Sequence, residues 1–469
     1  MAKCFRPDNL KQDLLLPPSL RDWLPEKHLA HFLADVVESL DLGTIYSSYE
    51  EKDGRGQAAY APALMVRLLV YGYCMGIYSS RKIESKTYED VAFRYLAVDE
   101  HPDHATLAEF RQRHLEALAG LFVQVLQLCQ KAGLVKLGHV AIDGSKIQAN
   151  ASKHKAMSYG RMGEAEKKLE EEVEELLRQA AGVDAAEDQK YGKGQREEGL
   201  PAELARRESR LEKIRAAKAE LEAEAKQKAE AEKAAVEVKL AQRAEQEEQS
   251  GKKAGGRKPQ VPDPATARPN PKAQRNFTDP ESRIMPDGSH KGSFVQGYNA
   301  QIAVDGQAQI IVAAEVTQDS NDTQQLAPML GQVEENTGSK PQAASADNGY
   351  WNSQQMEDPR VQGVDLHIAT GRQKHGESGA GGEEEAEEAS QAASLLEQMK
   401  QKLKSEGGRE LYRKRKAIVE PVFGQIKEWR DFRRFLLRGL CKVRAEWKLI
   451  CLSHNLLKLF RSGKVFRMA

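Results

Sequence analysis

Cysteine is scarce in this chain, and it is not spaced for a disulfide framework or a metal site. The 469 residues include five scattered cysteines without a C-x-x-C pair. None of the eleven histidines has the spacing of a zinc motif. Isolated thiols of this kind are typical of proteins in a reducing compartment, so we expect a cytoplasmic location without structural disulfides or zinc.

Long apolar runs are also missing. No stretch of about 18 apolar residues occurs, so the sequence predicts no membrane span. Residues 1–13, MAKCFRPDNLKQD, lack the apolar centre of a signal peptide. We therefore expect an intracellular protein without a membrane partner.

The chain has no net charge, but its charges are unevenly distributed. Lys plus Arg number 70, and Asp plus Glu number 70. Residues 409–467 nevertheless contain 17 Lys or Arg and only 5 Asp or Glu. A basic segment favours a polyanionic partner, although basic helices are also common on ordinary protein surfaces.

Residues 1–135 are predicted to form a helical domain. Apolar residues at helical spacing predict helices over residues 25–42 and 61–75. A helix over residues 79–95, a turn and a helix capped by Thr106 follow, and Arg111 is expected on the exposed face of the last one. Such a helix pair is compatible with a DNA-binding module, and a plain helical bundle fits it nearly as well.

Three segments differ in composition from the rest of the chain. Residues 160–248 are rich in Ala, Glu, Lys and Gln, with thin apolar stripes that predict a charged helical hairpin. Residues 249–283 are rich in Pro, Gly and Lys and predict a disordered linker. Residues 376–408 begin with an acidic run and form a second low-complexity insertion.

Strand patterns occur on both sides of these insertions. Residues 139–142 predict a short apolar strand, and residues 294–304 and 309–316 predict a hairpin joined at Asp305-Gly306. Residues 343–347 and 364–369 predict two further short strands. Residues 136–159 and 284–469 are therefore expected to form one α/β domain around a mixed sheet.

Three carboxylates stand at the ends of predicted elements. Asp143 and Asp347 each end a strand close to a glycine. Glu420 precedes Pro421, which favours a helix that begins there with Glu420 as its cap. Lys427 follows seven residues later, on the same helix face two turns away. A lone strand-end aspartate more often merely caps a turn, and the recurrence of the same arrangement at Asp347 is what indicates a site.

Such a set of carboxylates predicts a site for phosphoryl transfer. Three carboxylates on two strands and a helix can bind two divalent cations, one for the attacking oxygen and one for the leaving oxygen. Mg²⁺ suits this role because it prefers oxygen ligands and keeps water positions open, with Mn²⁺ as the alternative. Among the other acidic residues, Asp319 and Asp322 are interpreted as helix N-caps and Glu428 as the rival of Glu420.

Four segments together strongly resemble the DDE transposases of bacterial insertion sequences: AIDGSKIQANAS, YNAQIAV, ADNGYW and VEPVFGQIKEWRDFRRFLLRGL. The resemblance implies a ribonuclease-H-like catalytic domain after a helical domain. It also implies that Asp143, Asp347 and Glu420 are the catalytic and metal-binding triad. A Tyr and an Arg precede the Glu in the related signature. Tyr412 and Arg415 have the right mutual spacing but lie one residue too far from Glu420.

The resemblance implies a DNA transposase that cleaves the terminal inverted repeats of its own element and joins the freed 3′-hydroxyl to target DNA. Double-stranded DNA is the implied partner, and a homodimer at least is expected because two ends are processed together. The residues expected at the DNA are Arg111, Arg415, Lys427, Arg430 and Arg434. A nuclease of the same fold that does not join DNA, and a catalytically idle DNA-binding protein, are the alternatives.

Overall fold

The computed structural model describes residues 19–50, 59–191, 202–250, 260–287, 292–370 and 388–464. The chain forms two compact units. Unit 1 comprises residues 1–147, 299–437 and 441–469, and unit 2 comprises residues 148–298 and 438–440. Within the described ranges, no helix is long and apolar enough to cross a membrane.

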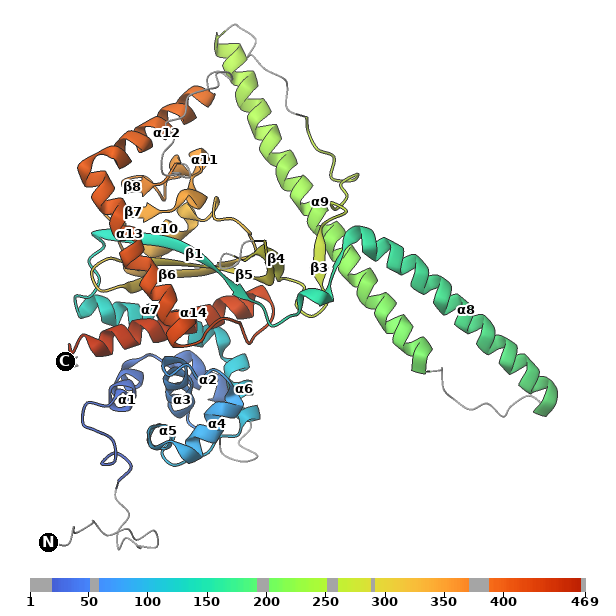
Figure 1. Ribbon diagram of the computed structural model, residues 1–469, viewed down its shortest axis with the longest axis horizontal. Helices are drawn as coiled ribbons and strands as arrows, with labels where there is room; N and C mark the ends of the chain where they lie inside the picture. The colour runs from blue at the N-terminus through green and yellow to red at the C-terminus, as the bar shows by residue number, and fades with distance from the viewer. Residues whose placement is uncertain are drawn as a thin grey trace, which may run out of the picture. The chain divides into compact units, whose positions relative to one another are not determined.

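Unit 1 begins with a group of helices. Their bounds are α1 Leu29–Ser39, α2 Gly43–Glu50, α3 Pro62–Cys74, α4 Ser80–Glu89, α5 Val91–Leu96, α6 His104–Arg113 and α7 Leu115–Lys131 (Figure 1). The helices predicted over residues 25–42 and 61–75 are confirmed as α1 and α3. Leu29, Leu33 and Val37 of α1 are buried, as their helical spacing predicts.

The prediction of one helix across residues 79–95 is wrong, because Asp90 interrupts it. Its backbone is extended, and its carboxylate accepts hydrogen bonds from the backbone N–H groups of Ala92 and Phe93 at the start of α5. The following helix also begins earlier than predicted. Asp103, rather than Thr106, caps α6 in the same manner.

A mixed sheet follows, and it confirms the predicted α/β class. Its strands are β1 His139–Gln148, β5 Phe294–Asp305, β6 Ile310–Thr317, β7 Ala343–Ala346 and β8 Asp365–Ile368. β5 and β6 form the predicted antiparallel hairpin, and β1, β7 and β8 are parallel neighbours. β4, Arg283–Pro286, pairs with the first residues of β5, and β5 also lies next to β1.

Helices cover the sheet and bury its apolar residues. Their bounds are α10 Leu326–Thr337, α12 Glu388–Lys404, α13 Glu406–Gly424 and α14 Leu440–Arg461. α13 packs against β7 and β8, whereas α7 and α10 pack against β6. Val140, Ile142 and Ile302 are fully buried in this core. α12 falls in the segment predicted as an acidic insertion, of which residues 376–387 lie outside the described residues.

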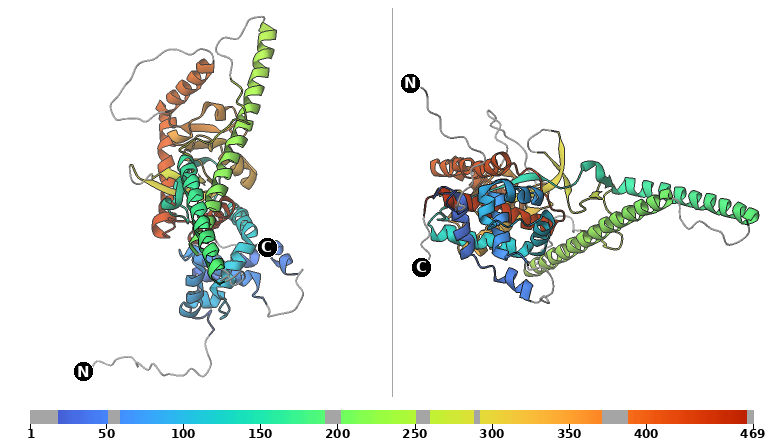
Figure 2. Two further views of the ribbon diagram at one scale, coloured as in Figure 1. Left: turned by 90° about the vertical axis from the view of Figure 1, so that its right-hand side faces the viewer. Right: turned by 90° about the horizontal axis from the view of Figure 1, so that it is seen from below.

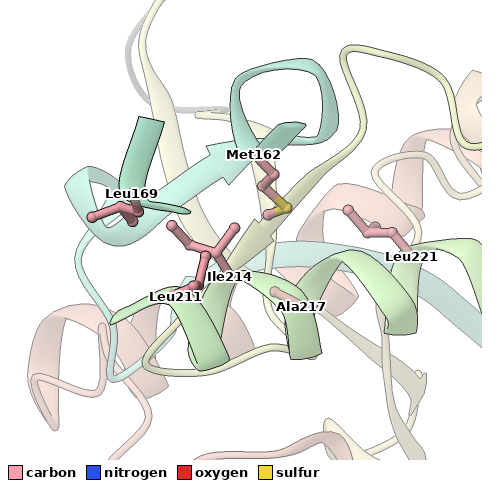
Figure 3. Packing of buried hydrophobic residues seen from close by; sticks show 6 residues of the cluster. All are labelled: Met162, Leu169, Leu211, Ile214, Ala217 and Leu221. Carbon is pink, nitrogen blue, oxygen red and sulfur yellow. The ribbon is translucent and has the colours of Figure 1, made fainter. Parts of the chain in front are cut away.

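Unit 2 contains the two long charged helices, α8 Tyr159–Tyr191 and α9 Ala202–Ser250 (Figures 1 and 2). Lys218 pairs with Glu166 at 2.7 Å and Arg207 with Glu172 at 2.9 Å, so the two helices run antiparallel. Their buried contacts come from one small apolar cluster, shown in Figure 3: Met162, Leu169, Leu211, Ile214, Ala217 and Leu221.

The prediction of a disordered linker is wrong for the described part of residues 249–283. β3, Gln274–Asn276, pairs antiparallel with β2, Ala156–Ser158. Asn276 is fully buried; its Oδ1 accepts the backbone N–H of Thr278, and its Nδ2 donates to the carbonyl oxygen of Ser152. Ala273 and Phe277 of the same segment pack against the apolar cluster of unit 2. Side-chain-to-backbone bonds and these few apolar contacts order a segment whose composition predicts disorder. Residues 251–259 lie outside the described residues.

Candidate active site

Asp143 lies within β1 rather than at its end, because β1 continues to Gln148. The predicted strand end is therefore wrong, although the strand itself is confirmed. Oδ1 of Asp143 accepts the backbone N–H of Gly144 at 2.9 Å. Burial raises the pKa of Asp143 to about 6; Arg415 opposes this shift, and the charges of Asp347 and Asp322 add to it.

Asp347 follows β7 directly, as predicted. The register of the parallel pair β1–β7 sets Ala141 opposite Ser345, so Asp143 and Asp347 emerge at the same edge of the sheet. Oδ1 of Asp347 accepts the backbone N–H of Gly349 at 2.8 Å and thereby caps a short 3₁₀ turn, Asn348–Tyr350. Two carboxylates predicted from separate strands are thus brought together.

Helix α13 supplies the positive charge at this edge. Arg415 is 7% exposed, and its Nη1 lies 3.4 Å from Oδ2 of Asp143. The guanidinium also lies 5.9 Å from the ring centroid of Tyr412. Burial raises the pKa of Tyr412, Arg415 lowers it, and the charges of Asp347 and Asp143 raise it further. Tyr412 and Arg415 therefore both lie at the site, although they are one residue farther from Glu420 than in the family signature.

Glu420 differs from its predicted position. It lies inside α13, and so does Pro421, so Glu420 does not cap the start of a helix. It follows Arg415 by five residues, about 140° around the helix, and it is exposed. Glu420 forms no hydrogen bond or ion pair with any residue that the structure describes.

Lys427 lies next to β1, although not by the regular spacing predicted. A π-helical turn, Gln425–Trp429, follows α13, so the seven residues from Glu420 to Lys427 are not two α-helical turns. Nζ of Lys427 donates to Oγ of Ser145 and, at 3.1 Å, to the carbonyl oxygen of Lys146. Its ammonium is therefore held against Ser145 and Lys146, which follow Asp143 on β1.

Three of the arginines expected to contact DNA are buried, namely Arg111, Arg415 and Arg430, so their expected exposure is wrong. Arg111 is 7% exposed and donates to the carbonyl oxygen of Tyr78 at 3.0 Å. Arg430 is 2% exposed and donates to Ser453 and to the carbonyl oxygen of Ile450. Both guanidinium groups satisfy protein oxygens in the interior, so they have a structural role. Arg434 is exposed, as expected.

Asp322 is a polar residue of this region whose position the sequence did not indicate. It was expected to cap α10, but Gln325 is the N-cap residue of that helix. Oδ1 of Asp322 accepts hydrogen bonds from Asn299 and Gln301 on β5, each at 2.6 Å. Those two amides do lie on one strand face, as predicted. A D-x-N-D-T segment before a helix is typical of a cap, so no local signal distinguishes Asp322.

The site suits a divalent cation by its donor types. Asp143 and Asp347 supply carboxylate oxygens, which Mg²⁺ prefers, and the burial of Asp143 makes its negative charge costly without a nearby cation. Among the described residues, no three His, Cys, Asp or Glu side chains are grouped so as to hold a metal ion. A pair of carboxylates is sufficient for Mg²⁺, which is usually held by one or two of them together with water and phosphate oxygens.

Two family models match the chain. Residues 18–113 match the Transposase domain (DUF772), and residues 265–456 match the Transposase DDE domain. Asp347 and Glu420 lie within the second match, whereas Asp143 lies between the two matches. No significant match was found among curated proteins or solved structures.

The matches agree with the architecture described above. The first coincides with the N-terminal helices, and the second begins before β3 and extends into α14. The mixed sheet with flanking helices is the ribonuclease-H-like arrangement that the DDE domain implies. The family also implies a DNA substrate and a divalent metal. The chain therefore belongs to the DDE transposases of insertion sequences.

Proposed function

We propose that this transposase cleaves the phosphodiester bonds at both ends of its own insertion sequence and joins the freed 3′-hydroxyl groups to target DNA. The observation that carries the proposal is the meeting of Asp143 and Asp347 at one edge of the sheet, with Arg415 beside Asp143. Water is the nucleophile of the first step, and the 3′-hydroxyl is the nucleophile of the second.

Asp143, Asp347 and Glu420 are proposed to hold two Mg²⁺ ions, with Mn²⁺ as a substitute. When bound, such ions activate the attacking oxygen and stabilise the leaving oxygen of an in-line displacement. Glu420 is assigned on the family pattern and on its exposed place on α13, five residues from Arg415. Because Asp143 is largely buried, its carboxylate is shielded from bulk water, which strengthens its attraction for a cation.

The basic residues near this edge are proposed to position the DNA backbone. Lys427 is fixed against β1, so its ammonium presents a charge of defined location to a phosphate group. Arg434 is exposed on the segment that follows the π-helical turn. Arg415 is proposed to orient Asp143 rather than to contact DNA, because it is as buried as Arg111 and lies against that carboxylate. Arg111 and Arg430 are not included either, because both are buried.

The proposal includes at least a homodimer, because the two ends of one element must be cut and joined together. The substrate DNA carries the terminal inverted repeats, and target DNA is the acceptor. We place the reaction in the cytoplasm, on nucleoid DNA.

An excision and joining assay tests this function. A plasmid would carry the native locus with both flanks, and wild-type, Asp143→Asn or Glu428→Gln protein would be supplied separately with Mg²⁺. Glu428 is the matched control, since it is an exposed acid close in sequence to Glu420 that pairs with Arg433. We expect excision and reinsertion with wild type and Glu428→Gln, and neither product with Asp143→Asn, which should still bind DNA.

Other outcomes identify the alternatives. Cut ends without joined products would show a nuclease of the same fold. DNA binding without cutting by wild type, on flanks verified to contain both ends, would show an idle DNA-binding protein. Strand cleavage by Asp143→Asn would show that the site lies elsewhere.

A further inference from the structure

Asp322 is held in place by hydrogen bonds from buried side-chain amides. It lies in the segment between β6 and α10, and its Oδ1 accepts hydrogen bonds from Nδ2 of Asn299 and Nε2 of Gln301. Both amides are fully buried. Gln301 in turn accepts the hydroxyl hydrogen of Tyr350, which follows Asp347 by three residues. Two buried donors therefore fix one carboxylate oxygen.

The glycines on either side of the site show how close this carboxylate lies. A Cβ added to Gly144, the neighbour of Asp143, would lie 2.9 Å from Oδ1 of Asp322. A Cβ added to Gly349 would lie 3.0 Å from Oδ1 of Asp347 and 3.5 Å from Oδ2 of Asp322. Asp322 and Asp347 thus approach the same point from two different segments.

The polar atoms around Asp322 are not fully satisfied. Oδ2 of Asp322 accepts no hydrogen bond from the described residues, and the cation nearest to the carboxylate is Lys146, whose Nζ lies 3.8 Å from Oδ1. Oδ1 of Asn299 is buried without a hydrogen-bond partner within the described part of the chain. It lies 3.0 Å from the Cβ position at Gly144. A buried amide oxygen without a donor is costly unless a ligand satisfies it.

Carboxylate and amide oxygens are ligands for hard divalent cations. We propose that Asp322 is a further metal-binding carboxylate of this transposase and acts with Asp347, while Asn299 and Gln301 are positioning residues that aim it. Lys146, whose Nζ lies 3.8 Å from Oδ1, partly neutralises Asp322. This inference rests on the proposed function, since it adds a residue to the same divalent metal site.

Metal binding provides a test that does not depend on catalysis. Mn²⁺ would be titrated into the full-length protein, with the free ion measured by electron paramagnetic resonance, for wild type, Asp322→Asn, Asp319→Asn and Asp143→Asn. Asparagine keeps the shape of Asp322 and an oxygen that accepts from Asn299 and Gln301. Asp319 is the matched control on the same segment, where it accepts from Thr317 and Gln325.

We expect Asp322→Asn to weaken Mn²⁺ binding about tenfold or more, and Asp319→Asn to leave it within about twofold of wild type. Unchanged affinity in Asp322→Asn, together with a loss in Asp143→Asn, would overturn the inference and leave the proposed function intact. If wild type binds Mn²⁺ no more tightly than Asp143→Asn, the proposed metal site itself fails.

A second measurement uses only the wild-type protein, so it does not depend on how a variant folds. Fe²⁺ bound at the site, with ascorbate and hydrogen peroxide, generates hydroxyl radicals that cut the nearest backbone. We expect cuts near Asp143, Asp347 and Asp322, and Mg²⁺ in excess should suppress all three. Cuts near Asp143 and Asp347 without one near Asp322 would contradict the inference.

Discussion

Nη1 of Arg415 lies 3.4 Å from Oδ2 of Asp143, although 272 residues separate the two in sequence. The guanidinium limits the rise that burial causes in the pKa of this carboxyl, which is about 6. α13 therefore contributes a cation to the site.

Replacing Arg415 by Gln should shift the pH dependence of DNA cleavage. Without the guanidinium the pKa of Asp143 rises further, so a higher pH is needed to ionise the carboxylate that binds metal. The acid limb of the rate profile should therefore move to higher pH than in wild type. Initial cleavage rates between pH 5 and 9 measure this, and an unmoved acid limb would contradict the assigned contact.

Arg430 and Arg434 lie four residues apart. Alanine at position 430 should lower stability, whereas alanine at position 434 should lower DNA affinity. Arg430→Ala leaves the carbonyl oxygen of Ile450 and the hydroxyl of Ser453 without their buried donor, so the free energy of unfolding should fall by about 2–4 kcal/mol. Arg434→Ala should change it by less than about 0.5 kcal/mol.

DNA affinity separates the same pair of variants. Arg434→Ala should weaken DNA binding and lower the slope of log affinity against log salt by about 1, as the loss of one phosphate contact requires. Folded Arg430→Ala protein should keep the wild-type salt slope. A reduced slope for Arg430→Ala would instead place its guanidinium at the DNA.

Glu446 on α14 should make stability depend on pH. It is fully buried and accepts the backbone N–H groups of Leu436 and Leu437, and burial raises its pKa to about 7. An unfolded glutamate titrates near about 4.3. Between these values the native state holds a proton that the unfolded state has released, so stability falls as the pH rises through this window.

Glu446→Gln removes that titration and keeps an oxygen for the same two N–H groups. We expect the variant to be more stable than wild type above pH 7, by about 1–3 kcal/mol, with the difference shrinking toward pH 4. Thermal midpoints measured across this range provide the check. A constant difference between the two proteins would show that Glu446 does not titrate there.

Gly144→Ala should disturb the site from within. The added Cβ would overlap Nε2 of Gln301 and lie 2.9 Å from Oδ1 of Asp322 and 3.0 Å from Oδ1 of Asn299. Such overpacking costs about 1–3 kcal/mol, and it should displace the amides that fix Asp322. Gly138→Ala is the control, because a Cβ there meets nothing within 4 Å. Thermal midpoints and Mn²⁺ affinity should change only for Gly144→Ala.

The small core of unit 2 should depend on Ile214. This side chain is 1% exposed within the cluster of Figure 3, and Ile214→Ala should destabilise the packing of α8 on α9 by about 2–4 kcal/mol. Its neighbour Lys213 is exposed, so Lys213→Ala should have little effect. Hydrogen exchange of peptides from α8 and α9 measures both, and equal protection in the two variants would contradict the importance of the cluster.

Local pattern was sufficient for the central strands of the sheet, for helices α1 and α3 and for part of the site. Alternation and apolar runs predicted β5, β6, β7 and β8, whose residues are mostly buried, because a strand covered on both faces is rich in apolar residues. Helix boundaries were less accurate where one polar side chain decides them, as Asp90 and Asp103 do. The linker prediction was wrong because Asn276 bonds to the backbone and Phe277 packs on the apolar cluster of unit 2, and composition shows neither contact.

The sequence by itself determined the α/β class, the family resemblance and the two aspartates at the strands. Only the tertiary structure decided that Arg415 faces Asp143, that Arg111 and Arg430 are interior, and that Asp322 joins the site. The physical reason is that burial and hydrogen-bond partners are set by residues distant in sequence. The sequence around Asp322 is typical of a helix cap. Its place beside Asp143 and Asp347 depends on hydrogen bonds from Asn299 and Gln301 on β5.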